Sequence, residues 1–394
     1  MQTVRQRKKQ TKMNKWFFAA IFVGNVAGKT LQNVCLPLVL STSHVSMAAM
    51  ITYTGFVYFV FFALLDVILD IVVGPVEAIL QGGDRVLMGV ALQNSLNAVG
   101  TVFGGNSART PLTMQMSFAL LVNLLAPFFK FAIFGVACIA GLKKCGKWFV
   151  VAATLYLVAF VLTLMDTSGS INGFCALFVM GALFGVTYNI YQERAVECVD
   201  YGFDVGWLVS LKLATSVLRK QVVWLFLFSW MSVALAAVPH LDQAGGIMEF
   251  QITWIEFLFF ENFYMNLFIL GALVSFMTGV FMNKYDSSFN MLISNVSAVF
   301  SLWPGWLPDI SQQTVGFTPS VKWIVPAMIL SALAIYPSYL YSLESRALIM
   351  EYRSNGFSAA VAAASVVKRR SLVEEKDTSI LKGAEHSNQE SLLP

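Results

Sequence analysis

The chain contains little charge for its length. Charged residues make up 12% of its 394 residues, whereas 57% are hydrophobic and 14% are aromatic. These proportions exclude a soluble globular protein, because too few polar side chains are present to cover a water-exposed surface of this size. Lipid requires every backbone polar group to be paired, and the apolar segments lack the alternation of a membrane β-barrel. We therefore predict an all-α integral membrane protein.

Cysteine and histidine, which bind most protein zinc, are both scarce. The chain has Cys35, Cys138, Cys145, Cys175 and Cys198, together with His44, His240 and His386. These residues do not show the short spacing of a metal site or the pattern of a disulfide framework. We therefore predict neither a metal centre nor any other cofactor.

The basic charge is concentrated at the N-terminus. Residues 1–15 carry six Lys and Arg side chains and no acidic one, so this tail contributes +6 to a net charge of +4, and the rest of the chain sums to −2. We interpret the tail as a solvated cytosolic segment beside anionic lipid, not as a nucleic-acid-binding arm. The next segment, Trp16–Leu40, is long and contains Asn25 and Lys29, so we expect a retained first helix and not a signal peptide.

Ten hydrophobic segments follow one another between Trp16 and Tyr341. Each is about long enough to cross a bilayer, since roughly 20 apolar residues span the hydrocarbon core as a helix. They are residues 16–39, 46–73, 84–105, 112–140, 147–166, 171–192, 206–238, 262–283, 287–307 and 320–342. An even number of crossings places both termini on one side, and the Lys and Arg residues of the tails, the Gly141–Lys147 turn and the loops on that side predict that it is cytosolic.

The longest loop on the opposite side, residues 239–261, is acidic. Within it, aromatic and acidic residues alternate with helical spacing, which predicts an amphipathic helix lying on the membrane. Such a helix can be an interfacial anchor or a lid over a substrate site. The last segment, residues 346–394, is polar and is expected to be largely disordered in the cytosol.

The chain resembles two copies of a five-helix unit. Asn25 and Asn189 each precede a branched aliphatic residue, and a charged residue, Lys29 or Glu193, follows four positions later. With an odd number of helices in each unit, the copies must have opposite orientations in the membrane, as in many secondary transporters. The predicted parts are a tail 1–15, a first repeat 16–166, a second repeat 171–345 and a tail 346–394.

A few charged residues lie inside the hydrophobic segments. A charge in the hydrocarbon region costs about 2.5–3.5 kcal/mol on insertion scales, so such residues usually face a partner or a water-filled cavity. Lys29 lies near the middle of the first helix, and Asp66 and Asp70 share a face of the second. A contact between Lys29 and Asp66 would neutralise both, either as cavity-lining groups or as a buried structural pair. We expect Asp70 to reach the cytosolic interface.

Two further helices carry polar series that are candidates for the same cavity. Their polar residues are Gln93, Asn94 and Asn97 in the third helix and Gln115, Asn123 and Lys130 in the fourth. Pro127 permits a kink in the fourth helix and leaves a backbone carbonyl unpaired. Hydrogen bonding between helices accounts for these residues as well as substrate binding does.

Charge and small residues mark other positions. Lys212, Arg219 and Lys220 interrupt the long segment 206–238, where they can lie at the cytosolic interface or act as cavity cations for an anionic substrate. Glycines recur at four-residue spacing as Gly24 and Gly28, Gly100 and Gly104, and Gly181 and Gly185. Glycines spaced four residues apart are typical of helices that pack closely against each other.

These features resemble the drug/metabolite transporter superfamily, and within it the chloroquine-resistance-transporter-like family. The resemblance rests on the ten-helix layout, on Asn189–Glu193 followed by Asp204, and on Thr110–Lys130 with its Gln and Pro. It implies two inverted five-helix repeats around a central cavity that opens alternately to each side. It also implies proton-linked transport of amino acids, peptides, thiols or cationic drugs, often out of an acidic compartment such as a vacuole or lysosome-like organelle.

The match to that family is incomplete at two places. Asn25 and Lys29 look like its helix-1 Asn and following basic residue, although the spacing here is one residue shorter. The family's parasite members carry cysteine pairs in the loop between helices 7 and 8, whereas no cysteine follows Cys198 in this chain. The plasma membrane is the alternative location.

We therefore expect a secondary transporter, and not an enzyme, that moves a small polar organic solute by alternating access. The predicted cavity residues are Asn25, Lys29, Asp66, Gln93, Asn97, Gln115, Asn123, Lys130 and Asn189. Asp66 and Glu193 are the predicted proton carriers, because a desolvated carboxylate can hold a proton near neutral pH. Expected partners are the substrate, membrane lipid and protons. The alternatives are an intramembrane enzyme, a channel and a non-transporting membrane scaffold, but the sequence shows neither a convergent acid/base set nor a filter-like loop.

Overall fold

The computed structural model is helical throughout its regular structure. It describes residues 15–41, 45–78, 80, 83–105, 110–136, 138–166, 171–199, 201–203, 206–236, 238, 246–307 and 319–351, and none of these residues forms a strand. The chain divides into two compact units, Met1–Ser342 and Leu343–Pro394, and the helices below belong to the first. The predicted tails lie outside the described residues, apart from Lys15 and 346–351.

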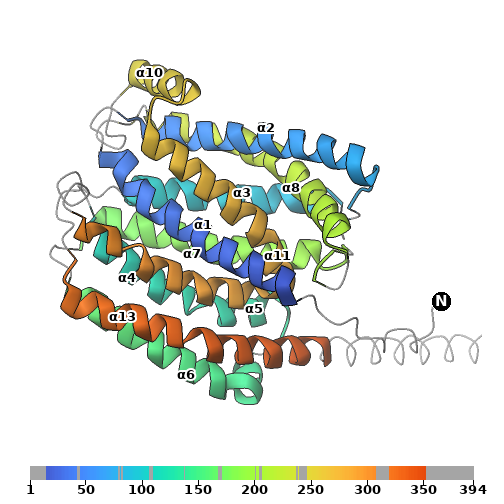
Figure 1. The fold of residues 1–394 in the computed structure, drawn as a ribbon. Coiled ribbons are helices and arrows are strands. Elements are labelled where there is room, and N and C mark those ends of the chain that lie inside the picture. Colours follow the sequence, from blue (N-terminus) through green and yellow to red (C-terminus); the bar gives the residue numbers. More distant parts are fainter. Residues whose placement is uncertain are drawn as a thin grey trace, which may run out of the picture. The chain divides into compact units, whose positions relative to one another are not determined.

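The helices follow the chain order shown in Figure 1. They are α1 Lys15–Ser41, α2 Met47–Val73, α3 Arg85–Gly104, α4 Leu112–Asn123, α5 Ala126–Ile133, α6 Cys138–Met165, α7 Gly173–Val196, α8 Trp207–Ser229, α9 Met231–Ala236, α10 Ile247–Leu258, α11 Phe263–Phe300, the 3-10 turn η2 Trp303–Trp306, and α13 Val321–Leu333.

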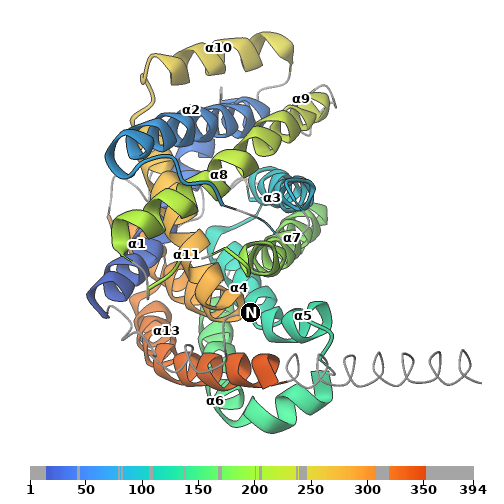
Figure 2. The same cartoon turned by 90° about the vertical axis from the view of Figure 1, so that its right-hand side faces the viewer.

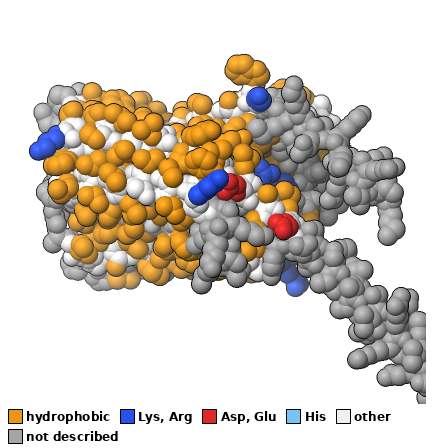
Figure 3. Space-filling model, turned by 90° about the horizontal axis from the view of Figure 1, so that it is seen from below, with side chains coloured by type: hydrophobic (Ala, Val, Ile, Leu, Met, Phe, Trp, Pro, Cys, Tyr) orange, Lys and Arg blue, Asp and Glu red, His pale blue; other side chains and the backbone are white. Residues whose placement is uncertain are grey.

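Within the described residues, eight helical stretches are long and apolar enough to cross a membrane. They are Met47–Val73, Arg85–Gly104, Leu112–Ile133, Gly146–Met165, Gly173–Val196, Trp207–Leu235, Phe263–Trp306 and Val321–Glu351. Large apolar side chains such as Leu64 and Ile71 on α2 and Val150 and Val161 on α6 are exposed, as lipid-facing residues are. Figure 3 shows broad hydrophobic areas on one face. The protein is therefore a multi-pass, all-α membrane protein.

The predicted fourth and fifth segments have different bounds in the structure. The fourth, predicted as 112–140, breaks after Asn123 into α4 and α5, and α5 already ends at Ile133. The break follows from Pro127, which has no N–H to donate to the carbonyl of Asn123. The turn predicted at Gly141–Lys147 is wrong, because those residues lie inside α6.

The two segments predicted as 262–283 and 287–307 are joined in α11, which bends at Asp286. This residue has φ −170° and ψ 114°, outside helical values. Its Oδ1 accepts a hydrogen bond of 2.8 Å from the backbone N–H of Phe289, so Asp286 caps the helical limb that follows. Residues 263–285 are called the first limb of α11 below, and residues 287–300 the second limb. The views in Figures 1 and 2 show the chain changing direction at the bend.

Glycines bring helix pairs into close contact, which confirms the predicted packing role. A Cβ on Gly28 of α1 would lie 2.8 Å from the backbone nitrogen of Ser275 on α11, and one on Gly100 of α3 would lie 2.5 Å from the Cα of Gly181 on α7. The α1–α11 and α3–α7 pairs are the most extensive in the unit, followed by α2–α8 and α6–α13. Only glycine permits such close backbone approach.

The amphipathic helix expected in residues 239–261 is α10. Trp254 donates a hydrogen bond of 3.0 Å to the hydroxyl of Thr52 on α2, and the Thr253 hydroxyl accepts one of 3.2 Å from the backbone N–H of Ser46. Phe257 is buried against Tyr53. Figures 1 and 2 show α10 lying across the α2 side of the unit.

Candidate functional site

A partly open cavity of about 310 Å³ lies among seven helices. It is lined by the second half of α1, the first half of α2, the second half of α3, α4, α7, the last third of α8 and both limbs of α11. All of these segments except parts of α7 and α11 lie toward the end of the helices where α1 finishes and α2 begins. We call this the hollow end of the unit, and the opposite end the closed end.

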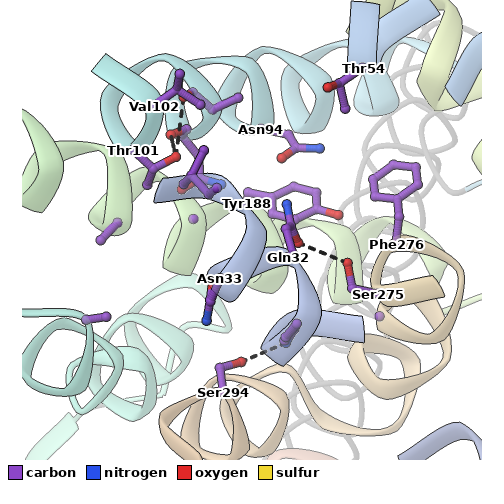
Figure 4. Close-up of a pocket in the computed structure, with 18 of the residues that line it drawn as sticks. Gln32, Asn33, Thr54, Asn94, Thr101, Val102, Tyr188, Ser275, Phe276 and Ser294 are labelled. Atoms are coloured by element: carbon purple, nitrogen blue, oxygen red, sulfur yellow. Dashed lines mark hydrogen bonds between the residues drawn. The ribbon is translucent and has the colours of Figure 1, made fainter. Parts of the chain in front are cut away.

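The cavity has both polar and apolar lining residues. Figure 4 shows Asn94 of α3, Tyr188 of α7 and Phe276 of α11 projecting toward one space, with Gln32 hydrogen-bonded to Ser275 beside it. Amides and hydroxyls from all seven helices form the polar lining. The apolar lining consists of Leu36, Met50, Ile51, Val102, Met116, Phe178, Leu225, Phe268, Phe276 and Met291, together with alanines. Such a combination suits a molecule with both polar and apolar parts.

Lys29 supplies the cavity's only charged side chain among the described residues. Its Nζ donates hydrogen bonds to Asn290 Oδ1 at 2.8 Å and to Ser294 Oγ at 2.7 Å, both on the second limb of α11. Both hydrogen-bond partners of the Lys29 ammonium group are therefore neutral. An ammonium group has three donors, so one remains for a bound molecule.

Below the cavity, a layer of buried amides joins α1, α7, α8 and α11. We call Asn25, Asn189, Gln192, Gln221, Asn283 and Asn290 the amide layer. Asn290 accepts from Asn25 at 2.6 Å and donates to Asn189 at 3.2 Å and to Asn283 at 2.6 Å. Asn283 donates to Asn189 at 2.7 Å and to Gln192 at 2.6 Å, and Gln192 donates to Gln221 at 2.8 Å. Polar groups bonded in this way hold the helices together in a medium that offers no water.

An ionic triad lies beside the amide layer on α7 and α11. Lys130 of α5 is fully buried, and its Nζ lies 3.0 Å from Glu193 Oε1 and 3.0 Å from Asp286 Oδ2. Glu193 also accepts hydrogen bonds from the backbone N–H and the hydroxyl of Ser287. The triad thus joins α5 and α7 to the bend of α11.

Aromatic side chains fill the closed end beside these polar groups. We call Phe17, Phe18, Phe22, Phe203, Phe281, Tyr285 and Phe289 the aromatic cluster. Phe18 lies 5.0 Å from Phe203 and 5.1 Å from Tyr285 between ring centroids, and Phe22 stacks on Phe289 at 6.3 Å. Edge and stacked contacts of this kind contribute energy beyond the burial of apolar area.

Asp66 lies away from the cavity, in a second ionic cluster between α2 and α8. Its carboxylate is 2.7 Å from Lys212 Nζ and 3.1 Å from Arg219 Nε. Asp70 also pairs with Lys212, at 2.6 Å. The expected contact between Lys29 and Asp66 is therefore wrong, because α8 supplies the two cations that neutralise Asp66. Arg219 lines no part of the cavity.

The structure brings five of the nine predicted cavity residues to the cavity wall. These are Lys29, Asn97, Gln115, Asn123 and Asn189. Asn25 supports the wall from behind through Asn290. Lys130 lies in the triad, Asp66 in the α2–α8 cluster, and Gln93 is absent from the lining although Asn94, its neighbour, is present. Asn123 donates to Asn295 at 2.8 Å, so it also joins α4 to α11.

The sequence did not indicate the partner residues of these contacts. Asp286 was not identified, because residues 284–286 fall between the predicted segments 262–283 and 287–307. Asn283 and Asn290 lie inside those segments but were not singled out. The available signal was the Asp286-Ser287-Ser288 string, which has the composition of a helix N-cap. Lys212 was recognised as an unusual charge, but no feature of the sequence indicated Asp66 as its partner.

The site can bind a molecule through hydrogen bonds and one positive charge. In the part of the chain that the structure describes, no group of three or more His, Cys, Asp or Glu residues could hold a metal ion. Comparison with protein-family models and with curated proteins finds no match for this chain.

Proposed function

We propose that this protein is a secondary transporter, not an enzyme, that carries a small polar organic solute across a membrane by alternating access. The observation that carries the proposal is the cavity itself: a polar, partly open space within membrane-crossing helices, followed by a closed layer of buried polar contacts. Polar side chains are costly inside lipid, and a solute pathway is the usual reason for gathering them around a cavity. The proposed solutes are amino acids, peptides, thiols and drug-like molecules.

The neighbour pattern supports ten crossings in two inverted repeats. Adding α1 to the eight apolar stretches, and taking the two limbs of α11 as separate crossings, gives ten. In an inverted five-plus-five plan, crossings 1 and 3 correspond to crossings 6 and 8. A contact between crossings 1 and 8, which are α1 and the first limb of α11, therefore corresponds to a contact between crossings 6 and 3, which are α7 and α3. The two most extensive helix pairs, α1–α11 and α7–α3, fit that equivalence. The same plan makes α2–α8 and α6–α13 contacts across the two-fold axis.

The amide layer supplies a second argument for the repeat. Asn25 and Asn189 are the residues that begin the two similar strings in the sequence, and both hydrogen-bond to Asn290. We propose that the chain belongs to the drug/metabolite transporter superfamily, near the chloroquine-resistance-transporter-like proteins, and has both termini in the cytosol. The hollow end then faces the lumen of an acidic organelle.

We further propose that Glu193 carries the coupled proton, and not Asp66. Asp66 has two cationic partners, Lys212 and Arg219, so its ionised form is well compensated. Glu193 shares Lys130 with Asp286, and in the described part of the chain no other cation forms an ion pair with it. A proton on Glu193 would leave Lys130 paired with Asp286 and loosen the link between α7 and the bend of α11.

The experiment that tests transport fills the cavity without disturbing the packing. Gly279 lines the cavity, and a Cβ there would meet no atom within 4 Å. We expect Gly279→Trp to abolish solute uptake by proteoliposomes in a screen of amino acids, short peptides, glutathione and cationic drugs, with and without a pH gradient. Gly89→Trp is the matched control, because Gly89 is also unobstructed but does not line the cavity.

The screen also distinguishes transport from a scaffold role. Uptake by the wild type and by Gly89→Trp, but not by Gly279→Trp, supports a carrier that uses this cavity. If no solute moves under either gradient, or if the two variants transport equally well, the cavity is not a transport pathway. Loss of the pH-gradient response in Glu193→Gln, with uptake retained in Asp66→Asn, would assign the proton to Glu193.

A further inference from the structure

Lys29 is half-buried and differs from Lys130 and Lys212, two lysines that are fully buried among these helices. Lys130 and Lys212 each lie within 3.0 Å of two carboxylates. Lys29 contacts only neutral oxygens, those of Asn290 and Ser294, and no carboxylate of the described residues pairs with it. A charge within a membrane-crossing helix is unfavourable without a counter-ion, so a negative group bound in the cavity would be stabilised beside Lys29.

We infer that the cavity selects a small organic anion, with Lys29 binding its carboxylate or a similar acidic group. This inference rests on the proposed transport function and names the substrate class of the same site. The third N–H of Lys29 can donate to the anion while Asn290 and Ser294 hold the ammonium in place. Because no acidic side chain lines the cavity among the described residues, cationic drugs are disfavoured within the range of solutes considered above.

The remaining walls indicate what the rest of the anion resembles. Asn33, Asn94 and Asn97 offer amide donors in the cavity lining, while Leu36 and Phe276 offer apolar surface. The volume of about 310 Å³ is at the lower end of the range of about 300–1,000 Å³ found for small-molecule sites. The substrate is therefore a compact carboxylate with a short apolar group, rather than a long peptide.

Three probes with the same branched alkyl group separate the effect of charge from that of shape. They are isovalerate, isovaleramide and isoamylamine, which carry a carboxylate, a neutral amide and an ammonium group. Calorimetry on the purified full-length protein in micelles measures their binding. We expect isovalerate to bind about tenfold or more tightly than isovaleramide, since a charge-assisted hydrogen bond is roughly twice as strong as a neutral one. Isoamylamine is expected to bind most weakly.

Variants of Lys29 then assign the selectivity to this residue. Lys29→Met should remove the preference for isovalerate over isovaleramide, and Lys29→Arg should retain it, because only the second keeps a cation. Thermal unfolding and size-exclusion profiles identify any variant that fails to fold. Should Lys29→Met fail to fold, the order of the three probes on the wild type and on Lys29→Arg decides the question.

The outcomes separate this inference from the transport proposal. Equal binding of isovalerate and isovaleramide, or tighter binding of isoamylamine, overturns anion selection, even if uptake assays show that another solute is carried. Uptake of isovalerate above protein-free liposomes that is lost in Gly279→Trp supports both proposals. If isovalerate binds through Lys29 but neither it nor any solute of the screen moves, the transport function fails and anion binding stands.

Discussion

The hollow end and the closed end of the helical unit treat polar side chains in opposite ways. At the hollow end, Asn94 and other amides of the wall face a cavity. Toward the closed end, the amides of the amide layer, of which Asn189 and Asn290 also line the cavity, bond to one another across four helices. Beyond them, Lys130 lies between two carboxylates. The same helices, α1, α7 and α11, contribute to both ends. The presence of polar residues on a helix therefore does not by itself decide which end is closed.

Pairing between polar residues makes the difference. A buried polar group that has lost water must find a partner in the protein, whereas one beside a cavity can use water or a solute. The closed end is therefore a place where single substitutions leave groups without partners. At the hollow end, substitution of an amide that faces the cavity, such as Asn94, should change binding and leave stability almost unchanged. Alternating access would require the closed end to open a cavity while the polar groups of the hollow end pair with one another.

Removal of the buried ammonium should give the largest loss of stability. Lys130→Met leaves Glu193 and Asp286 close together without their shared cation, and removing one partner of a buried ion pair costs about 3–5 kcal/mol. The free energy of unfolding in mixed detergent micelles measures this loss. Lys220→Met is the control, because its partners Glu77 and Asp84 are mostly exposed, and such pairs contribute about 0–1 kcal/mol. Similar losses in the two variants would show that the triad does not stabilise the closed end.

An amide substitution at each end compares the two ends directly. Asn283→Ala removes the donor to Asn189 and Gln192 and the acceptor for Asn290. We expect a loss of about 2–3 kcal/mol, since each buried group left without a partner costs about 1–3 kcal/mol. Asn94→Ala at the hollow end should change the unfolding free energy by less than about 0.5 kcal/mol, as exposed sites do.

The same two variants should act in the reverse order on binding. Asn94→Ala removes a cavity amide, so it is expected to weaken isovalerate binding, whereas any binding change in Asn283→Ala should follow from its lower stability. If Asn94→Ala proves the more destabilising of the two, the distinction between a hollow end and a closed end is wrong.

Most of the helices could be predicted from the sequence, because apolar length is a local property. The predicted segments 46–73 and 84–105 differ from α2 and α3 by one residue at most at each end. The break in the fourth helix was predicted from Pro127, whose missing N–H acts locally. The α6 start was not, since Gly141–Lys147 has the composition of a turn but lies within a helix.

Pairing between distant residues could not be predicted in the same way. Lys29 was singled out because its charge interrupts an apolar helix, and it lines the cavity. Its partners, Asn290 and Ser294, lie more than 260 positions away in the sequence. Asp66 was assigned to the wrong cation, because several helices carry a lysine and only the packing of α2 on α8 selects Lys212.

Substitutions of two glycines, one on α1 and one on α11, test how tightly these two helices pack. A Cβ on Gly28 would meet the backbone of Ser275 at 2.8 Å and of Gly271 at 2.9 Å, so Gly28→Ala should destabilise by about 1–3 kcal/mol. Gly279→Ala on α11 adds the same methyl group to the cavity, where it meets nothing. Because alanine favours helix by up to about 1 kcal/mol over glycine, this variant should be neutral or stabilising. Unfolding in micelles measures both, and equal destabilisation would mean that the α1–α11 contact is looser than the structure indicates.

The smallest expected effect is a pH dependence at the hollow end, outside the membrane-crossing helices. Asp166 follows α6, and its Oδ2 accepts a hydrogen bond of 2.9 Å from the backbone N–H of Ser320. Partial burial raises the pKa of Asp166 above its ordinary value of 3.8, although that hydrogen bond opposes the shift. A carboxyl whose pKa is higher in the folded state adds stability at low pH, and this contribution is lost as the pH rises through the folded pKa. Between about pH 4 and about pH 6, the unfolding temperature of the wild type should therefore fall slightly relative to that of Asp166→Asn. Parallel curves for the two proteins would show that the hydrogen bond from Ser320 offsets the burial, and that the hollow end does not respond to acid through this residue.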